Sequence, residues 1–136
     1  MTLLALALLL ASQLPGPDAR EVARAAAEQC GDLKCVADTF VWGHAESGLS
    51  RVPKPWSKDA REGLSCGVLQ TPCASTPRDV AGQVRVWLRM RAQSLAACGD
   101  LTGLASGTCG RATRLVQARE QEAAGWLYLA QWQEMP

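Results

Sequence analysis

The sequence has few aromatic residues and almost no net charge. Its 136 residues include five Trp, one Tyr and one Phe, and Ala, Leu and Val supply most of the apolar content. This composition favours packed helices over a sheet, in which β-branched and aromatic side chains are more common. The net charge of +1 provides no strong attraction for nucleic acid or for an anionic membrane. We therefore expect a mainly α-helical domain that does not bind nucleic acid.

The sequence also lacks the residue patterns of a metal site. No Cys-x-x-Cys pair occurs and His44 is the only histidine, so the usual zinc-ligand spacings are absent. The His-Ala-Glu triplet at 44–46, followed by Pro-Cys at 72–73, matches part of a zinc-deaminase signature, but Thr76 stands where its second cysteine would be. We expect neither a metal ion nor an organic cofactor.

No apolar run is long enough to cross a membrane, which takes about 20 residues. The longest run extends from Thr2 to Ala11 and is followed by polar, Pro and Gly residues as far as Pro17. We predict that residues 1–17 are a signal peptide and that the protein is exported to the periplasm or the extracellular space. The alternative is a buried N-terminal helix. Residues 18–136 suffice for a single domain with one core.

Six cysteines, an even number, are present in this short chain. Such a set is typical of disulfide-bonded proteins in an oxidising compartment. About 15 pairings are possible in principle, and the order of the cysteines along the chain favours three local bonds. The predicted pairs are Cys30 with Cys35, Cys66 with Cys73, and Cys98 with Cys109.

Helical spacing of apolar residues is found in four stretches. Asp18 and Thr76 are predicted N-caps, with Pro77 in the first helical position. The region from Ser47 to Cys73 has several Pro and Gly residues and no periodicity, which indicates a long loop of the kind that often carries function. The predicted helices are 20–29, 33–45, 77–98 and 111–132. The arginines expected on solvated helix faces, from which one could also meet the carboxylates of a peptide stem, are Arg85, Arg89, Arg91, Arg111, Arg114 and Arg119.

Glu46 lies where a predicted helix ends, directly before Ser47 and Gly48. A carboxyl group in this position can be shielded by core residues on one side and open to a cleft on the other. Shielding from water favours the protonated form near neutral pH, which is the form that a general acid needs. Glu46 is therefore the candidate catalytic residue, and the alternative is a solvated glutamate at a helix end.

Two short motifs support this choice. Glu-Ser-Gly at 46–48, followed by Gly-Val-Leu-Gln at 67–70 and Thr-Pro at 71–72, resembles the lysozyme-like lytic transglycosylases of the soluble (SLT) type. That family closes its catalytic helix with Glu-Ser and has a Gly-Leu-Met-Gln-like segment afterwards. The resemblance covers residues 39–110, about half of the chain. It implies a mainly α lysozyme-like superfold, stapled by disulfides, in a monomeric bacterial enzyme that acts on peptidoglycan in the cell wall.

The resemblance also implies roles for the matching residues. Glu46 would protonate the oxygen between N-acetylmuramic acid and N-acetylglucosamine, and the acetamido and hydroxymethyl groups of the substrate would complete the reaction, leaving an anhydro-muramoyl end. Ser47 would contact the sugar or orient Glu46. Gln70 would bind the glycan through its amide, and Gly67 would let the backbone pass close to the sugar.

The sequence departs from the family pattern in two regions. The loop after Glu46 is longer than usual and contains Trp56, which is either a platform for sugar stacking or part of a lid packed on the core. Leu-Ala-Ser-Gly at 104–107 stands where the family has Tyr-Asn-Ala-Gly, so the tyrosine near the catalytic acid is missing. Asp59 or Glu62 would supply the second carboxylate of a hydrolytic, lysozyme-type muramidase, which is one alternative. A non-catalytic module that binds glycan or a protein partner is the other.

Overall fold

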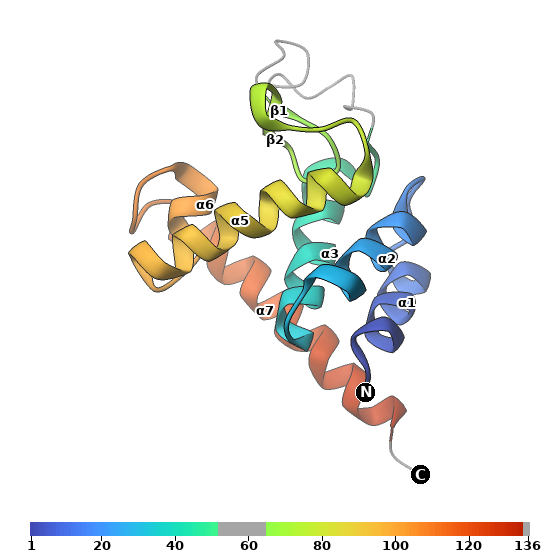
Figure 1. Cartoon of the computed structure of the whole chain (residues 1–136). Coiled ribbons are helices and arrows are strands. Elements are labelled where there is room, and N and C mark those ends of the chain that lie inside the picture. The colour runs from blue at the N-terminus through green and yellow to red at the C-terminus, as the bar shows by residue number, and fades with distance from the viewer. Residues whose placement is uncertain (52–64, 135–136) are drawn as a thin grey trace.

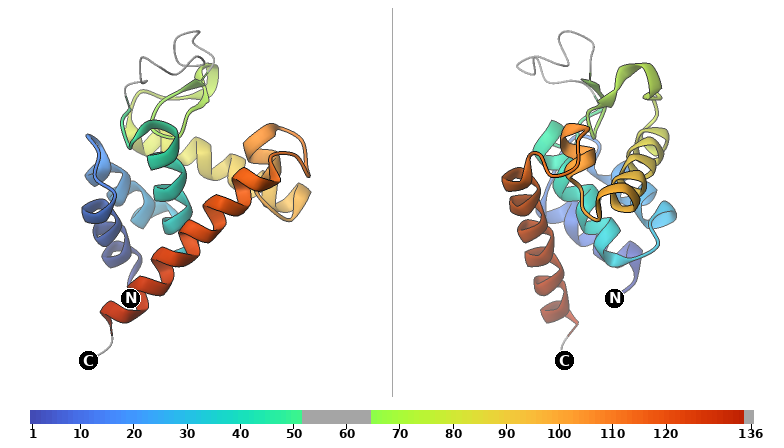
Figure 2. Two further views of the ribbon diagram at one scale, coloured as in Figure 1. Left: turned by 180° about the vertical axis from the view of Figure 1, so that it is seen from behind. Right: turned by 90° about the vertical axis from the view of Figure 1, so that its left-hand side faces the viewer.

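The computed structural model describes residues 1–51 and 65–134 and is mainly helical, as the composition predicts. Helix α3 runs through the middle of the molecule, and Figure 2 shows α5 and α7 on opposite sides of it. Trp56, Asp59 and Glu62 lie outside the described residues. The helices are α1 (Leu3–Gln13), α2 (Ala19–Gln29), α3 (Leu33–Ser47), α5 (Val80–Cys98), α6 (Thr102–Ser106) and α7 (Thr113–Gln133) (Figure 1).

Helix α3 is defined by a cap at each end. The Asp32 carboxylate accepts a hydrogen bond from the Cys35 N–H at 2.8 Å, which satisfies a backbone donor of the first turn. Gly48, with φ of 66°, ends the helix in the left-handed conformation that glycine adopts without strain. Residues 35–43 are buried without interruption. The helix is therefore the core element against which the others pack.

Helices α1 and α2 lie side by side and both pack against α3 (Figure 1). The side chains of Leu6, Ala7 and Leu10 in α1 are fully buried. Asp18 precedes α2 as predicted, but its side chain makes no cap hydrogen bond and instead accepts one from the Arg51 N–H at 2.7 Å. Helix α1 falls within the predicted signal peptide, whose cleavage stays a prediction.

The described part of the predicted long loop contains a small hairpin. Strands β1 (Ser65–Cys66) and β2 (Thr71–Pro72) pair antiparallel, and the short 3₁₀ helix η1 (Cys73–Ser75) follows. The disulfide between Cys66 and Cys73 joins the two ends of this unit. Strands of two residues are too short to show an alternating pattern, which explains why the sequence predicted a loop here.

Helix α5 begins later than predicted. Thr76 does not cap it, because the helix begins at Val80. The Thr76 hydroxyl instead donates a hydrogen bond to the Pro72 carbonyl at 2.7 Å. The cap is Asp79, whose carboxylate accepts a hydrogen bond from the Gly82 N–H at 2.8 Å. Thr76 and Asp79 are both residue types that cap helices, so the sequence contains two possible start points. The hydrogen bond from Thr76 to the hairpin leaves Asp79 as the cap.

The connection between α5 and α7 contains α6 and is joined by the third disulfide, between Cys98 and Cys109. All three disulfides have the predicted pairing, Cys30–Cys35 included. Helix α7 packs along α3 through a narrow buried stripe of Val116, Ala123 and Ala130. Within the described ranges, no helix combines the length and the apolar character that a membrane span requires.

Candidate functional site

A cavity of about 210 Å³ lies beside the C-terminal half of α3, between the hairpin, α5 and α6. Glu46 and Gln70, which the sequence predicts to share one cleft, both line it. Glu46 has the only titratable side chain among the described residues of this wall. The wall includes Trp42, Glu46, Leu69, Gln70, Trp87 and Leu104.

Glu46 is held by an arginine that the sequence placed on a solvated face. The Arg119 guanidinium, on α7, donates a hydrogen bond through Nη1 to Glu46 Oε1 at 2.8 Å. The side chain of Arg119 is only 11% exposed, and that of Glu46 is 32% exposed. The guanidinium carbon of Arg119 also lies 4.3 Å from the centre of the Trp42 ring, a cation–π distance. The shielding expected for Glu46 is therefore partial, and it comes with a positive charge.

Two tryptophans form the apolar part of the cavity wall. Trp42 on α3 and Trp87 on α5 are both almost fully buried, with ring centres 6.2 Å apart and planes tilted by 50°. This arrangement is within the range of favourable aromatic contacts. Trp42 lies one helical turn before Glu46 and faces the same side of α3. Its four-residue spacing from Glu46 is the signal in the sequence that marks it as part of the site.

Ser47 does not reach the cavity. Its side chain is 1% exposed, so a contact with a sugar does not fit the structure. The Ser47 hydroxyl oxygen lies 2.6 Å from the Val68 carbonyl, to which it donates a hydrogen bond, and it accepts one from the Ser50 N–H at 3.2 Å. Ser47 thus fastens the hairpin to the end of α3, which orients the segment that carries Gln70 relative to Glu46.

Gly67 is required by the turn and by a neighbouring side chain. Its φ of 82° is one that other residues rarely adopt, and a Cβ atom there would lie 2.7 Å from Cδ of Gln83. Gln83 is buried, accepts a hydrogen bond from the Val68 N–H at 2.9 Å and donates one to the Pro77 carbonyl at 3.0 Å. The close approach predicted for Gly67 is therefore to Gln83, and Gly67 is not among the described residues of the cavity wall.

Gln70 combines an unusual backbone with a position on the cavity. Its φ of 51° is in the left-handed region, and its amide donates a hydrogen bond to the Gly67 carbonyl at 2.8 Å. A non-glycine residue in this conformation is uncommon and is often found where function constrains the backbone. One amide hydrogen is used within the turn, and the side chain lines the cavity with Glu46.

Helix α6 brings the divergent third motif to the cavity. Leu104 and Ala105 both line it, at the place in the sequence where the resembled family has its tyrosine. The corner between α5 and α6 is fixed by the buried Ser94 hydroxyl, which accepts a hydrogen bond from the Leu104 N–H at 3.0 Å and donates one to the Asp100 carbonyl at 2.7 Å. The Leu104 side chain has no polar group to offer to Glu46.

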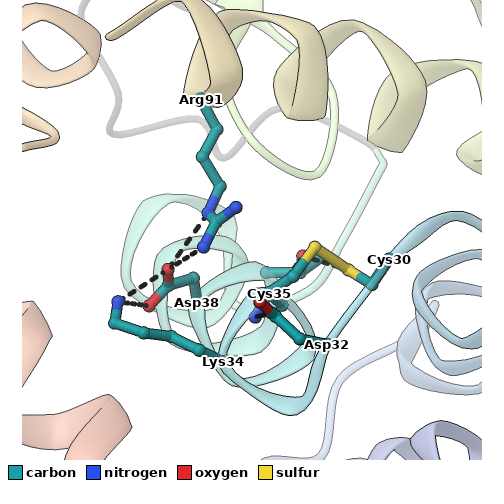
Figure 3. The surroundings of a disulfide bond; sticks show 7 residues. Cys30, Asp32, Lys34, Cys35, Asp38 and Arg91 are labelled. Atoms are coloured by element: carbon teal, nitrogen blue, oxygen red, sulfur yellow. Dashed lines mark hydrogen bonds and ion pairs between the residues drawn. A yellow bond between two sulfur atoms is a disulfide. The ribbon is translucent and has the colours of Figure 1, made fainter. Parts of the chain in front are cut away.

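A second charged cluster lies two turns before Glu46 on the same face of α3. Asp38 is 1% exposed and accepts hydrogen bonds from Arg91 on α5 at 2.9 Å and from Lys34 at 3.0 Å (Figure 3). Lys34 also pairs with Glu120 on α7 at 2.9 Å. Burial raises the pKa of Asp38, although Lys34 and Arg91 oppose the rise. Arg91, like Arg119, was predicted to be solvated and is instead paired.

Burial lowers the pKa of Lys34, but hydrogen bonds to Glu120 and Asp38 outweigh that effect and leave it raised.

Among the described residues, no group of three or more His, Cys, Asp and Glu side chains is arranged to hold a metal ion. Comparisons with protein-family models, curated proteins and solved structures find no significant match to the chain. The resemblance to a family therefore rests on the sequence motifs alone.

Proposed function

We propose that the chain is a peptidoglycan lytic transglycosylase of the lysozyme-like superfold, with Glu46 as general acid and base. The observation that carries the proposal is that the two matching motifs and the divergent third region meet at one cavity. Glu46 comes from the first motif, Gln70 from the second, and Leu104 from the region of the third. The three disulfides are typical of proteins in oxidising compartments, which suits an exported monomer, periplasmic or extracellular, acting on the glycan strand.

In the proposed reaction, one proton moves out from Glu46 and one returns. The protonated carboxyl gives its proton to the glycosidic oxygen while the bond from that oxygen to C1 of the muramoyl unit breaks, and N-acetylglucosamine leaves with a new hydroxyl. The acetamido oxygen of the muramoyl unit bonds to C1 as the glycosidic bond breaks. The 6-hydroxyl of the same muramoyl unit then attacks C1 and displaces the acetamido oxygen. Glu46, now a carboxylate, takes the proton of that hydroxyl. One carboxyl suffices because the acetamido and 6-hydroxyl groups of the substrate act at C1, in contrast to glycosidases that need two carboxyl groups. No water is consumed.

The other residues of the site support this reaction by position. Trp42 and Trp87 form the apolar floor of the cavity next to the acid. Both are almost fully buried, so they shape the cavity and do not serve as a stacking surface for a sugar. Gln70 places an amide on the same cavity. Ser47 and Gln83 keep the hairpin in place through hydrogen bonds to Val68. A site of this kind depends on such support, because small misplacements of reacting groups are costly.

The test uses disulfide-bonded protein and purified peptidoglycan, with soluble fragments identified by mass spectrometry. The wild type is expected to release fragments with anhydro-muramoyl ends. The variant Glu46→Gln should lose about 10²–10⁴ in rate, because it cannot donate the proton. Glu122→Gln changes an exposed glutamate of α7 and is the matched control. Reducing ends in place of anhydro ends would instead indicate a hydrolytic muramidase with water as the acceptor.

A non-catalytic module is the second candidate. Two observations favour it: Arg119 occupies Oε1 of Glu46, and Leu104 replaces the hydroxyl-bearing tyrosine. In that case neither the wild type nor Glu46→Gln would release fragments, while co-sedimentation with peptidoglycan would show binding. Release of fragments by the wild type but not by Glu46→Gln excludes this candidate.

A further inference from the structure

Among the described residues, Arg119 is the cation paired with the candidate acid, and the sequence did not single it out. Its guanidinium is bound on two sides, by the carboxylate of Glu46 and by the ring of Trp42. The next residue, Glu120, pairs with Lys34 in the first turn of α3. Helix α7 is thus fixed to α3 at two points, which leaves the Arg119 side chain little freedom to move away from Glu46.

The hydrogen bond from Arg119 engages only one oxygen of the carboxylate. Oε1 receives Nη1 at 2.8 Å, and within the described residues no hydrogen bond reaches Oε2. The cavity that Glu46 lines has no other titratable side chain among its described residues. His44 is on the same helix but exposed. The two oxygens of Glu46 are therefore unequal, one held by a cation and the other available for proton transfer.

We infer that Arg119 is the positioning residue of this site: its guanidinium lies over Trp42 and holds Oε1 of Glu46, so that Oε2 is the oxygen that gives and takes the proton. This inference rests on the proposed lytic activity. It assigns to α7, which lies outside the resembled motifs, a part in the reaction. Arg119 also supplies the polar partner of Glu46 that α6 does not provide, because α6 lines the cavity with Leu104 and Ala105.

The positioning role of Arg119 predicts a pattern that a purely structural residue would not give. A residue that orients the reacting carboxyl affects kcat, and its loss leaves KM little changed. Restoring a positively charged N–H donor at the same position should restore part of kcat. Loss of packing alone should not give this pattern.

The experiment measures kcat and KM on soluble peptidoglycan strands. Arg119→Met keeps an aliphatic stem over Trp42 but removes the charge and the donors. We expect kcat to fall about 10²-fold through misplacement of the carboxyl, with KM little changed. Arg119→Lys keeps a positively charged N–H donor, so it should recover part of kcat. Arg114→Met, at an exposed arginine of α7, should match the wild type.

Circular dichroism and thermal unfolding establish that each variant is folded. If Arg119→Met does not fold, Arg119→Gln replaces it, since it lacks the charge and the length of arginine, and the same fall in kcat with little change in KM is expected. An active wild type together with a folded Arg119→Met of unchanged kcat overturns the inference and leaves the proposed function standing. A loss of kcat that Arg119→Lys does not relieve also overturns it. An inactive wild type overturns both.

Discussion

Asp38 and Glu46 are two acidic residues on one face of α3, two turns apart, and the fold treats them differently. Asp38 is fully buried and accepts hydrogen bonds from Lys34 and Arg91, so both of its oxygens are occupied. Glu46 is one-third exposed, has one cationic partner and lines a cavity. The sequence pattern alone does not distinguish them. Their surroundings do: Asp38 joins helices, whereas Glu46 is placed where it can contact a ligand.

The difference shows what makes an acidic residue available for chemistry. A carboxylate whose oxygens are all engaged away from solvent stabilises the packing of its partners but has no site for a further ligand. A carboxylate with one oxygen fixed and the other unengaged among the described residues is oriented and still reactive. An ion pair alone therefore does not distinguish scaffold from site. The number of engaged oxygens and the adjoining cavity do.

The largest effect on stability is expected at Asp38. Asp38→Ala removes the acceptor of Arg91, whose side chain is mostly buried, and should lower the free energy of unfolding by about 3–5 kcal/mol. Urea unfolding followed by circular dichroism measures this. Asp38→Asn is the matched control and should cost less, because its amide oxygen can still accept a hydrogen bond from Arg91. Equal losses in the two variants would contradict this account of the cluster.

The pH dependence of stability sharpens the comparison further. Because burial raises the folded-state pKa of Asp38 above its usual value of 3.8, the folded state keeps this proton to higher pH than the unfolded state. The contribution is fully present below pH 3.8 and is lost as pH rises through the folded pKa. Urea midpoints measured from pH 3 upwards should show a wild-type decrease in this window that Asp38→Asn lacks. Parallel curves for the two proteins would show that Asp38 does not titrate there.

In contrast to Asp38, Glu46 should contribute little to stability and much to the proposed activity. Glu46→Gln removes the charge of a carboxylate that is one-third exposed, and its amide oxygen can still accept a hydrogen bond from Arg119, so a cost of about 0–1 kcal/mol in unfolding free energy is expected. The same change should abolish most of the proposed activity. Measuring both quantities on one preparation separates the two roles. If Glu46→Gln destabilised the protein as much as Asp38→Ala does, the distinction between scaffold and site would not hold.

The sequence predicts the main helices and disulfides better than it predicts the contacts within the site. Helical spacing located the long helices, because apolar residues that share a face recur every three or four positions. The order of the cysteines gave the correct disulfides. Helix α6, the hairpin and the cap at Asp79 were not predicted. Each depends on a few residues, and their conformation is set by contacts such as the Thr76 hydrogen bond to Pro72.

Within the site, motif order correctly brought Glu46 and Gln70 to one cavity. The partners of these residues could not be predicted, because they come from distant parts of the chain. Arg119 is 73 residues from Glu46, and its sequence neighbourhood is that of any exposed helix face. Ser47 matched its motif, but only the position of Val68 shows that its hydroxyl serves the hairpin. Pattern gives the face of a helix, whereas packing between helices decides which charges on that face are paired.

The smallest effect is expected at Lys34, and it decides which cation the Asp38 cluster depends on. The Lys34 side chain is 46% exposed, and both of its ion pairs are within reach of solvent and salt. Lys34→Ala should therefore lower the unfolding free energy by about 0.2–1 kcal/mol, and less at high salt. Glu120→Gln, which removes only the outer pair, should cost no more. A loss as large as that of Asp38→Ala would mean that Lys34, rather than Arg91, offsets the burial of the Asp38 charge. Asp38 would then depend on a solvent-exposed partner, and the contrast with Glu46 would be one of degree.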